Sequence, residues 1–180
     1  MHLSLLKKYF FINSFEPNLI KCQDKNTTII YRNYEKKNIL PELLKIKYFC
    51  RKNNYKFFLA NNIKLALNLG LDGAYLPSFN KKLNHIAYSL KKDFILLGSA
   101  HNLKEIKLKE KQKVKMIFLS SLFKKNKNYL GLNKFKKLSE RCQIDVIALG
   151  GISRNNLKKI SLLNIAGLAG ITYFKKKAPY

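Results

Sequence analysis

The chain has 180 residues, of which 47% are hydrophobic, and a formal net charge of +26 from 36 Lys and Arg residues against 10 Asp and Glu residues. This length and apolar content exclude intrinsic disorder and are enough to bury the core of one domain over residues 1–180. The apolar runs, such as residues 144–152, are too short to cross a membrane, and Cys22, Cys50 and Cys142 lack the spacing of a disulfide scaffold.

Short strand-like runs alternate with amphipathic helical stretches along nearly the whole chain. Runs rich in β-branched, aliphatic and aromatic residues predict eight strands, at residues 9–13, 27–32, 55–60, 72–76, 94–98, 114–119, 145–149 and 167–172. Helices are predicted from Pro41 onward, between the Asn61–Asn62 cap and Gly70, at 80–92, 102–111 and 132–142, and after the Ser153 cap. The stretch after Pro17 is a short helix at best, and too few residues follow Thr172 for a full last helix.

Strands separated by helices indicate a parallel sheet, because parallel neighbours need crossover connections. Eight such units are the number that closes a (βα)8 barrel, for which about 250 residues are typical. We therefore predict an α/β fold, a compact TIM barrel with short first and last helices. A doubly wound open sheet is the alternative.

The basic excess consists of 32 lysines and only 4 arginines, and Asn and Ile are also abundant. These are residues of AT-rich codons, whereas Arg is preferred for bidentate recognition of bases and phosphates. We interpret the excess as a solvated lysine-rich surface that attracts small anions. A basic RNA-associated protein is a more remote alternative, because no aromatic-basic RNA motif is present.

The N-terminal stretch MHLSLLKKYFFINSF does not have the pattern of a secretory signal, because Lys7 and Lys8 interrupt it and no small-residue cleavage site follows. Together with the unpaired cysteines this predicts a cytoplasmic protein with no membrane partner. His2 is expected in a loose terminus and His85 on a helix surface, and Lys175 to Lys177 are expected to form a solvated tail. Nothing in the sequence indicates an oligomeric state.

In a (βα)8 barrel the working residues lie at the carboxyl ends of the strands, and the loops after strands 7 and 8 commonly bind phosphate. Gly150–Gly151 ends the predicted seventh strand, and Ile171 and Thr172 end the predicted eighth. Glycines there allow backbone N–H groups to approach an anion closely. The alternative is that Gly150–Gly151 is only a tight turn.

Several segments carry a family resemblance, in matching order over roughly residues 9–174. The runs Phe57-Phe58-Leu59-Ala60-Asn61, Leu65-Ala66 and Gly70 to Leu76 resemble F-I-I-N-D, L-A and G-A-D-G-V-H-L. The run Leu97 to Asn102 resembles G-x-S-x-H, and Leu130 to Leu132, Val146 to Ile152 and Ala166 to Thr172 resemble L-G-L, V-x-A-I-G-G-I and A-G-V-A-V-I-S. These motifs are similar to those of the thiamine phosphate synthase and thiazole tautomerase (TenI-type) family.

The resemblance implies a barrel enzyme of thiamine biosynthesis that joins aminopyrimidine diphosphate to thiazole phosphate and releases pyrophosphate with Mg²⁺ present. It implies that Gly150, Gly151, Ile171 and Thr172 bind the substrate phosphate. Ser99 and Lys127 would contact substrate, the latter on a loose match to the family's loop lysine. Arg32 is the one residue kept from the family's Q-x-R-x-K segment and would be catalytic.

The chain departs from the family pattern at the positions implied to hold the metal. Asn61 stands where the family has the aspartate of its N-D pair, and Asn80 stands near its acidic ligand after strand 4. Neutral amides in place of carboxylates would weaken a Mg²⁺ site severely. Mg²⁺ is therefore implied by the resemblance and disfavoured by these degenerate metal positions.

Two alternatives follow from this loss. The tautomerase branch of the family needs no metal and uses a general acid, a role that His101 after the predicted fifth strand can fill. A barrel that binds thiazole phosphate without catalysis is the other. For the residues themselves, His101 can instead be a loop histidine bonded to backbone, and Arg32 can instead be a structural partner of Glu35 or Asp72.

Overall fold

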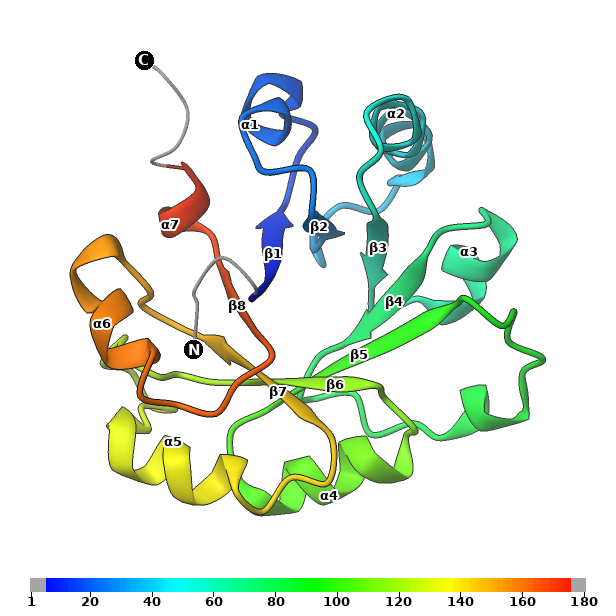
Figure 1. Ribbon diagram of the computed structural model, residues 1–180. Coiled ribbons are helices and arrows are strands. Elements are labelled where there is room, and N and C mark those ends of the chain that lie inside the picture. Colours follow the sequence, from blue (N-terminus) through cyan, green and yellow to red (C-terminus); the bar gives the residue numbers. More distant parts are fainter. Residues whose placement is uncertain (1–5, 176–180) are drawn as a thin grey trace.

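The computed structural model describes residues 6–175 and contains a closed barrel of eight parallel strands arranged in sequence order (Figure 1). The strands are β1 (Lys7–Ile12), β2 (Thr27–Tyr31), β3 (Phe57–Ala60), β4 (Gly73–Leu76), β5 (Ile95–Ala100), β6 (Met116–Leu119), β7 (Asp145–Leu149) and β8 (Gly167–Gly170). All eight predicted strands are present. The predicted (βα)8 barrel is therefore confirmed, and the open sheet is excluded.

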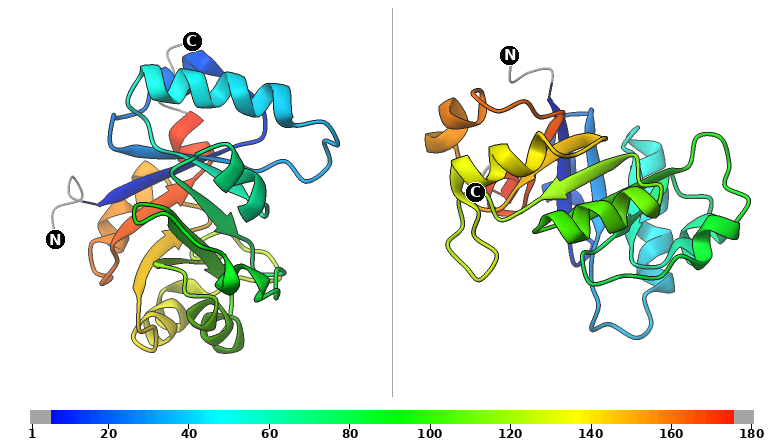
Figure 2. Two further views of the ribbon diagram at one scale, coloured as in Figure 1. Left: turned by 90° about the vertical axis from the view of Figure 1, so that its right-hand side faces the viewer. Right: turned by 90° about the horizontal axis from the view of Figure 1, so that it is seen from below.

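Helices surround the ring of strands in the views of Figures 1 and 2. They are α1 (Pro17–Lys21), α2 (Leu40–Lys52), α3 (Ile63–Asn68), α4 (Leu103–Lys111), α5 (Gly131–Ser139), α6 (Leu157–Ile160) and α7 (Thr172–Lys175). The side chains of Asn62 and Asn102 cap α3 and α4 by accepting hydrogen bonds from backbone N–H groups one turn later. The first helix is short as predicted, with five residues, and four residues of α7 are described.

Alternate strand residues point into the barrel and fill it, as expected for a strand period of two. The interior cluster consists of Tyr9, Phe11, Ile30, Phe58, Ala60, Tyr75, Leu97, Met116, Phe118, Ile147 and Ala169. Phe118 lies at its centre, with ring centroids 5.1 Å from Tyr9, 5.5 Å from Phe11 and 5.4 Å from Tyr75, all edge to face. The barrel is thus a packed core, and its chemistry is confined to its two ends.

The other face of each strand packs against the helices in a second, larger core. Ile46 of α2, Ile106 of α4 and Phe135 of α5 are completely buried there. The apolar side chains predicted on helix faces therefore cover the outside of the barrel.

The predicted helix over residues 80–92 is wrong. This stretch holds only one 3₁₀ turn, Asn84–Ala87. Its backbone carbonyls are bound instead by two side chains of the α4 region: Lys109 Nζ donates to Asn80 O (2.9 Å), and Gln112 Nε2 donates to Asn80 O and Lys82 O (3.1 and 2.8 Å). His85 is correspondingly buried, with Nε2 2.9 Å from the carbonyl of Gln112, so its predicted place on a helix surface is also wrong.

No helix within residues 6–175 is long and apolar enough to span a membrane. The predictions for His2 and for Lys176 and Lys177 fall outside the described residues.

The central position of Phe118 gives a direct test of the interior. Phe118→Ala removes a completely buried ring that three other rings contact, and we expect it to lower the free energy of unfolding by about 3–5 kcal/mol. Chemical denaturation followed by circular dichroism measures this loss. Tyr48→Ala on α2, where the side chain is 72% exposed, serves as the control and should cost less than about 0.5 kcal/mol. Equal losses in the two variants would contradict this packing.

Candidate active site at the carboxyl ends of the strands

Closure of the barrel brings the carboxyl ends of all eight strands to one rim, and several predicted site residues continue the inward-facing positions of their strands. Arg32 lies two residues beyond Ile30, and Ile171 lies two residues beyond Ala169. Ser99 lies two residues beyond Leu97 on β5 and is buried. The period of two therefore directs these side chains toward the mouth of the barrel.

The ends of β7 and β8 form a cradle of backbone donors. The two strands are paired up to Leu149 and Ala169, so Gly150–Gly151 lies beside Gly170–Ile171. The glycines have φ values of +101° and +74°, a region that favours glycine. Within residues 6–175, the N–H groups of Gly150, Gly151 and Ile171 have no hydrogen-bond acceptor. Free N–H groups at two neighbouring strand ends suit an oxyanion.

The residues predicted to bind phosphate are thus brought together, with one correction. β8 ends at Gly170, and Thr172 is not in the strand but is the first residue of α7. It remains exposed next to Ile171 at the same rim.

The loop after β6 lies directly against the two glycines. A Cβ atom on Gly150 would be 2.5 Å from Ser121 Oγ, and one on Gly151 would be 2.5 Å from Lys124 N. The carbonyl of Gly150 also accepts a hydrogen bond from Phe123 N (2.8 Å). Gly150–Gly151 is therefore a tight turn, and the loop after β6 approaches it closely. Lys127 is exposed in this loop and makes no hydrogen bond or ion pair within the part of the chain described.

Arg32 lies among aromatic side chains. Its guanidinium carbon is 4.8 Å from the ring centroid of Phe11. The buried hydroxyl of Tyr75 donates to Ser99 Oγ (2.8 Å); burial raises the pKa of Tyr75, and hydrogen bonds with Ser99 and Arg32 act in the opposite direction. Between residues 6 and 175, Arg32 forms no ion pair with Glu35 or Asp72, so that alternative is not what the structure contains. The guanidinium charge is therefore not neutralised by a carboxylate.

Tyr34 and Phe79 are rim residues that the sequence did not single out. Their rings meet edge to face with centroids 5.5 Å apart, and both side chains are largely exposed. Desolvation of its hydroxyl raises the pKa of Tyr34, and the charge of Arg32 opposes that rise, which indicates that Tyr34 lies near Arg32.

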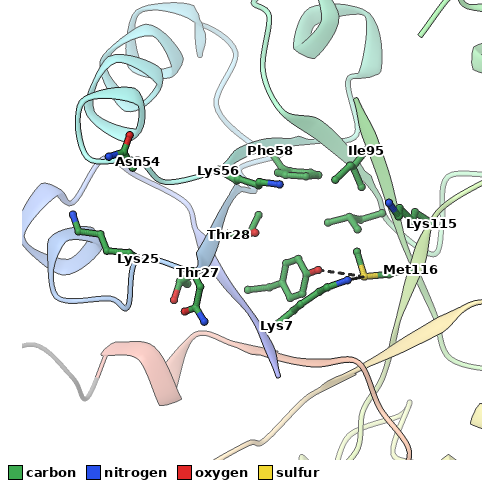
Figure 3. Close-up of a pocket in the computed structure, with 13 residues that line it drawn as sticks. Lys7, Lys25, Thr27, Thr28, Asn54, Lys56, Phe58, Ile95, Lys115 and Met116 are labelled. Atoms are coloured by element: carbon green, nitrogen blue, oxygen red, sulfur yellow. Dashed lines mark hydrogen bonds between the residues drawn. The ribbon is translucent and has the colours of Figure 1, made fainter. Parts of the chain in front are cut away.

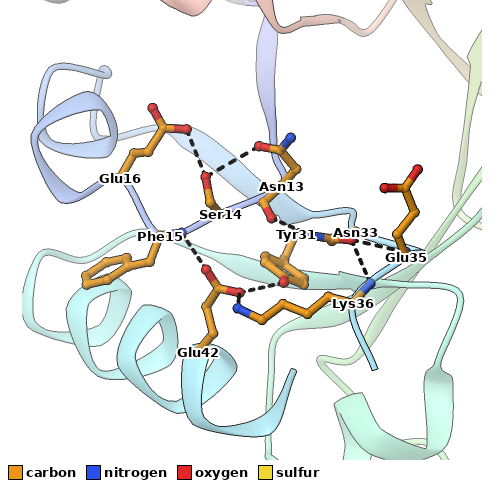
Figure 4. A network of polar contacts seen from close by, with 9 residues as sticks. All are labelled: Asn13, Ser14, Phe15, Glu16, Tyr31, Asn33, Glu35, Lys36 and Glu42. Carbon is orange, nitrogen blue, oxygen red and sulfur yellow. Dashed lines mark hydrogen bonds and ion pairs between the residues drawn. The ribbon is translucent and has the colours of Figure 1, made fainter. Parts of the chain in front are cut away.

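Glu42, at the start of α2, ties two rim loops together and was also missed (Figure 4). One carboxylate oxygen accepts a hydrogen bond from Phe15 N (2.9 Å), and the other accepts from the Tyr31 hydroxyl (2.7 Å) and from Lys36 Nζ (3.0 Å). Desolvation raises the pKa of Glu42, but these hydrogen bonds and the charge of Lys36 outweigh it, so the net shift is downward. This carboxylate helps to fix the loop carrying Arg32, together with the hydrogen bond from Asn33 Nδ2 to Asn13 O (3.0 Å).

Asn61 and Asn80 lie together at the rim beyond β3 and β4. Asn80 Nδ2 donates a 2.7 Å hydrogen bond to Asn61 Oδ1. Asn61 has φ +62°, a conformation that asparagine tolerates. The two predicted positions are therefore brought into contact by one hydrogen bond, while the side-chain oxygen of Asn80 accepts from Lys82 N (3.0 Å).

Similarity to known proteins shows the family of this chain. Residues 19–174 match the sequence family described as thiamine monophosphate synthase. The chain belongs to this family. A putative thiamine-phosphate synthase 2 of Aquifex aeolicus is 33% identical over 126 residues, which cover 67% of each protein. A thiamine-phosphate synthase of Methanococcus vannielii is 26% identical over 132 residues, which cover 71% of this chain and 64% of the relative.

The fold agrees with this assignment. The structure of a thiamine phosphate pyrophosphorylase from Pyrococcus furiosus superposes with a TM-score of 0.76 at 19% identity, covering 98% of this chain and 94% of that protein. The chain spans less than two thirds of the length of the Methanococcus relative.

Asn61 and Asn80 are the two positions at which the family resemblance implies a metal. The oxygen of Asn61 already accepts from Asn80, and neutral amides do not supply the anionic oxygens that Mg²⁺ prefers. The described residues contain no group of three or more His, Cys, Asp or Glu side chains that could hold a metal. The residues at these two positions therefore do not fit Mg²⁺.

His101 follows β5 and is partly buried. Its Nδ1 lies 2.7 Å from the carbonyl oxygen of Ser120, which can only accept, so Nδ1 carries the proton. Its backbone N–H donates to Glu105 (2.8 Å). His101 is therefore a loop histidine bonded to the backbone, which was one of the two alternatives expected from the sequence. The same bond leaves Nε2 as the basic atom of the neutral ring, so a role in proton transfer stays a prediction.

The three hydrogen bonds of Glu42 generate a pH-dependent prediction. Glu42→Gln should lower the free energy of unfolding at pH 7 by about 1–3 kcal/mol, since a neutral amide weakens the charge-assisted bonds and supplies one acceptor oxygen instead of two. Because the pKa of Glu42 is lowered in the folded protein, its contribution is present above the ordinary glutamate pKa and is lost as the pH falls through the lowered value. Urea unfolding of both proteins at several pH values measures the difference. A difference that grew as the pH fell would contradict this account.

Proposed function

We propose that this chain acts in thiamine biosynthesis by binding a thiazole phosphate at the carboxyl rim of the barrel and joining it to aminopyrimidine diphosphate to give thiamine phosphate. The observation that carries the proposal is the cradle of N–H groups at Gly150, Gly151 and Ile171, which have no acceptor among residues 6–175 and lie where β7 and β8 end side by side. Main-chain amides at this place suit a phosphate monoester. The reaction class comes from the family to which the chain belongs.

The residues of the rim have distinct tasks in such a reaction. The cradle holds the thiazole phosphate, with Thr172 adding a hydroxyl, and Lys127 on the covering loop adds a positive charge to the same region. The buried Ser99, tied to Tyr75, lines the inner end of the site. When the carbon–oxygen bond to pyrophosphate breaks, the electron pair leaves with the pyrophosphate and the thiazole nitrogen bonds to the carbon.

Arg32 is the residue we assign to the departing pyrophosphate. Its guanidinium is half-buried, forms no ion pair with a carboxylate within residues 6–175 and lies over the ring of Phe11, so its charge is available to an anion. Asn61 and Asn80 can offer only neutral hydrogen bonds, so no step is assigned to Mg²⁺. The protein would act in the cytoplasm on these phosphorylated small molecules.

A second candidate, a metal-independent thiazole tautomerase, is favoured by two observations. The amides of Asn61 and Asn80 are bonded to each other, and His101 is held in a defined tautomer by Ser120. The Nε2 atom of a ring oriented in this way can take up and return a proton. The same cradle would bind the phosphate in this reaction, and it would do so again if the barrel binds thiazole phosphate without catalysis.

The synthase proposal is tested with purified protein, thiazole phosphate and aminopyrimidine diphosphate, with and without Mg²⁺, and with chromatographic detection of thiamine phosphate. We expect product, and we expect Thr172→Asp to lower kcat/KM by at least about a hundredfold, because it places a carboxylate against the phosphate. Thr172→Asn is the matched neutral control and should retain most activity. Residue 172 is exposed, so neither change disturbs the core.

Other outcomes would separate the alternatives. Saturable binding of thiazole phosphate without product would overturn the synthase and favour the tautomerase or the binding protein, and tautomer conversion lost in His101→Gln would decide between those two. Binding of RNA that falls steeply with salt, with no response to either small molecule, would favour the nucleic-acid alternative.

A further inference from the structure

A cavity lies at the end of the barrel opposite the cradle, where the strands begin. It has a volume of about 370 Å³ and is lined by the first residues of several strands and the residues just before them (Figure 3). Its walls are of two kinds. The interior residues Phe58, Leu97 and Met116 form an apolar floor, and Lys7, Lys56 and Lys115 stand at the entrance. A cavity of this size holds a small organic molecule.

Two donors in this cavity point at the same poor acceptor. The hydroxyl of Tyr9 lies 3.4 Å from the sulfur of Met116, and Lys7 Nζ lies 3.7 Å from the same sulfur (Figure 3). A thioether is a weak acceptor, and these are the only hydrogen bonds of the two groups within residues 6–175. Tyr9 is only 3% exposed, so water does not readily replace the missing acceptor. The buried phenol therefore lacks an oxygen acceptor, and the exposed Lys7 ammonium group lies beside the same sulfur.

The residues that line the cavity carry an excess of positive charge. Four of its 13 lining residues are lysines and none is acidic. The Lys25 side chain is turned away, since its Nζ donates to Asn53 O (3.1 Å), whereas Lys7 and Lys56 extend toward the cavity from opposite sides (Figure 3). The acidic group that faces this region is Asp145, the register partner of Met116; burial first, and then its charge, raise the pKa of Tyr9. The lysines outnumber it, and the Asp24 carboxylate is paired with Lys8.

We propose that this amino-end cavity is a second ligand site that takes a small organic anion, with a phosphate or carboxylate group bound by Tyr9 and Lys7 and a ring-sized apolar body against Phe58 and Leu97. An anionic oxygen gives the hydroxyl and the ammonium group the acceptor that Met116 does not provide. Lys56 and Lys115 add attraction at the entrance. The site is independent of the rim cradle, because the packed interior of the barrel separates the two ends.

The methyl group of Met116 can report on this site by NMR. Its two methionines are Met1 and Met116, so protein labelled with [methyl-¹³C]methionine gives two methyl signals, and Met116→Leu identifies the one from the cavity. Phenyl phosphate is the probe, and benzyl alcohol is its neutral counterpart. We expect phenyl phosphate to shift the Met116 signal saturably and benzyl alcohol to shift it far less.

Variants then locate the anion. Tyr9→Phe and Lys7→Gln should each weaken the phenyl phosphate Kd by about tenfold, the effect of losing one charge-assisted hydrogen bond. Lys134→Gln on α5 makes the same change in net charge away from the cavity and should leave the Kd unchanged. Thr172→Asp at the other rim should also leave it unchanged, so failure of the proposed function and failure of this site are distinguishable. A Met116 signal that does not respond, or a Kd that Thr172→Asp weakens and Tyr9→Phe and Lys7→Gln do not, would overturn the proposal.

Discussion

The parallel pairing of β8 with β1 is the constraint on which the rest of the structure depends, because it closes the sheet and gives the barrel two separate ends. Lys7 pairs with Gly167 and Phe10 with Gly170 along this seam. The strands approach so closely that a Cβ on Gly167 would be 2.6 Å from the carbonyl oxygen of Lys7. Closure brings Lys7 beside Gly167 at the amino end, and the neighbouring pair β7–β8 places Gly150–Gly151 beside Gly170–Ile171 at the carboxyl end.

Closure of the barrel does not by itself hold the rim loops in place. Two polar side chains on helices also bind these loops through hydrogen bonds. Glu42 of α2 fixes the loops after β1 and β2. Lys109 of α4 is completely buried, and its ammonium group donates to Pro77 O, Asn80 O and Gln112 Oε1, which fixes the loop after β4. Desolvation lowers the pKa of Lys109 to about 8, opposed by Glu105. Both charges, the buried one of Lys109 and the partly buried one of Glu42, are retained because each has several hydrogen-bond partners.

The elements that the sequence predicted best are those governed by local pattern. The strands follow from runs of β-branched, aliphatic and aromatic residues, and the cap at Asn62 follows from residue type. The phosphate cradle followed from the position of Gly150 and Gly151 in an eight-unit chain, although its function remains a prediction.

The features that the sequence did not predict depend on long-range contacts. The helix expected at 80–92 is absent because Lys109 and Gln112, more than twenty residues away, bind the carbonyls of Asn80 and Lys82. The bond between Asn61 and Asn80 joins residues 19 positions apart and could not be read from either residue alone. The same holds for the contact of Tyr34 with Phe79. Each of these lies in the loops that form the mouth, where side chains rather than periodicity decide the conformation.

The central claim is that the free backbone N–H groups of Gly150 and Gly151 bind the phosphate of a thiazole substrate. The chain has 8 glycines, so [¹⁵N]glycine labelling gives a spectrum simple enough to follow each amide during a titration with thiazole phosphate. The account predicts saturable downfield shifts of the Gly150 and Gly151 amide protons, with little change at Gly73 on the opposite side of the barrel interior. Binding of thiazole phosphate that leaves both of these amides unshifted would contradict it.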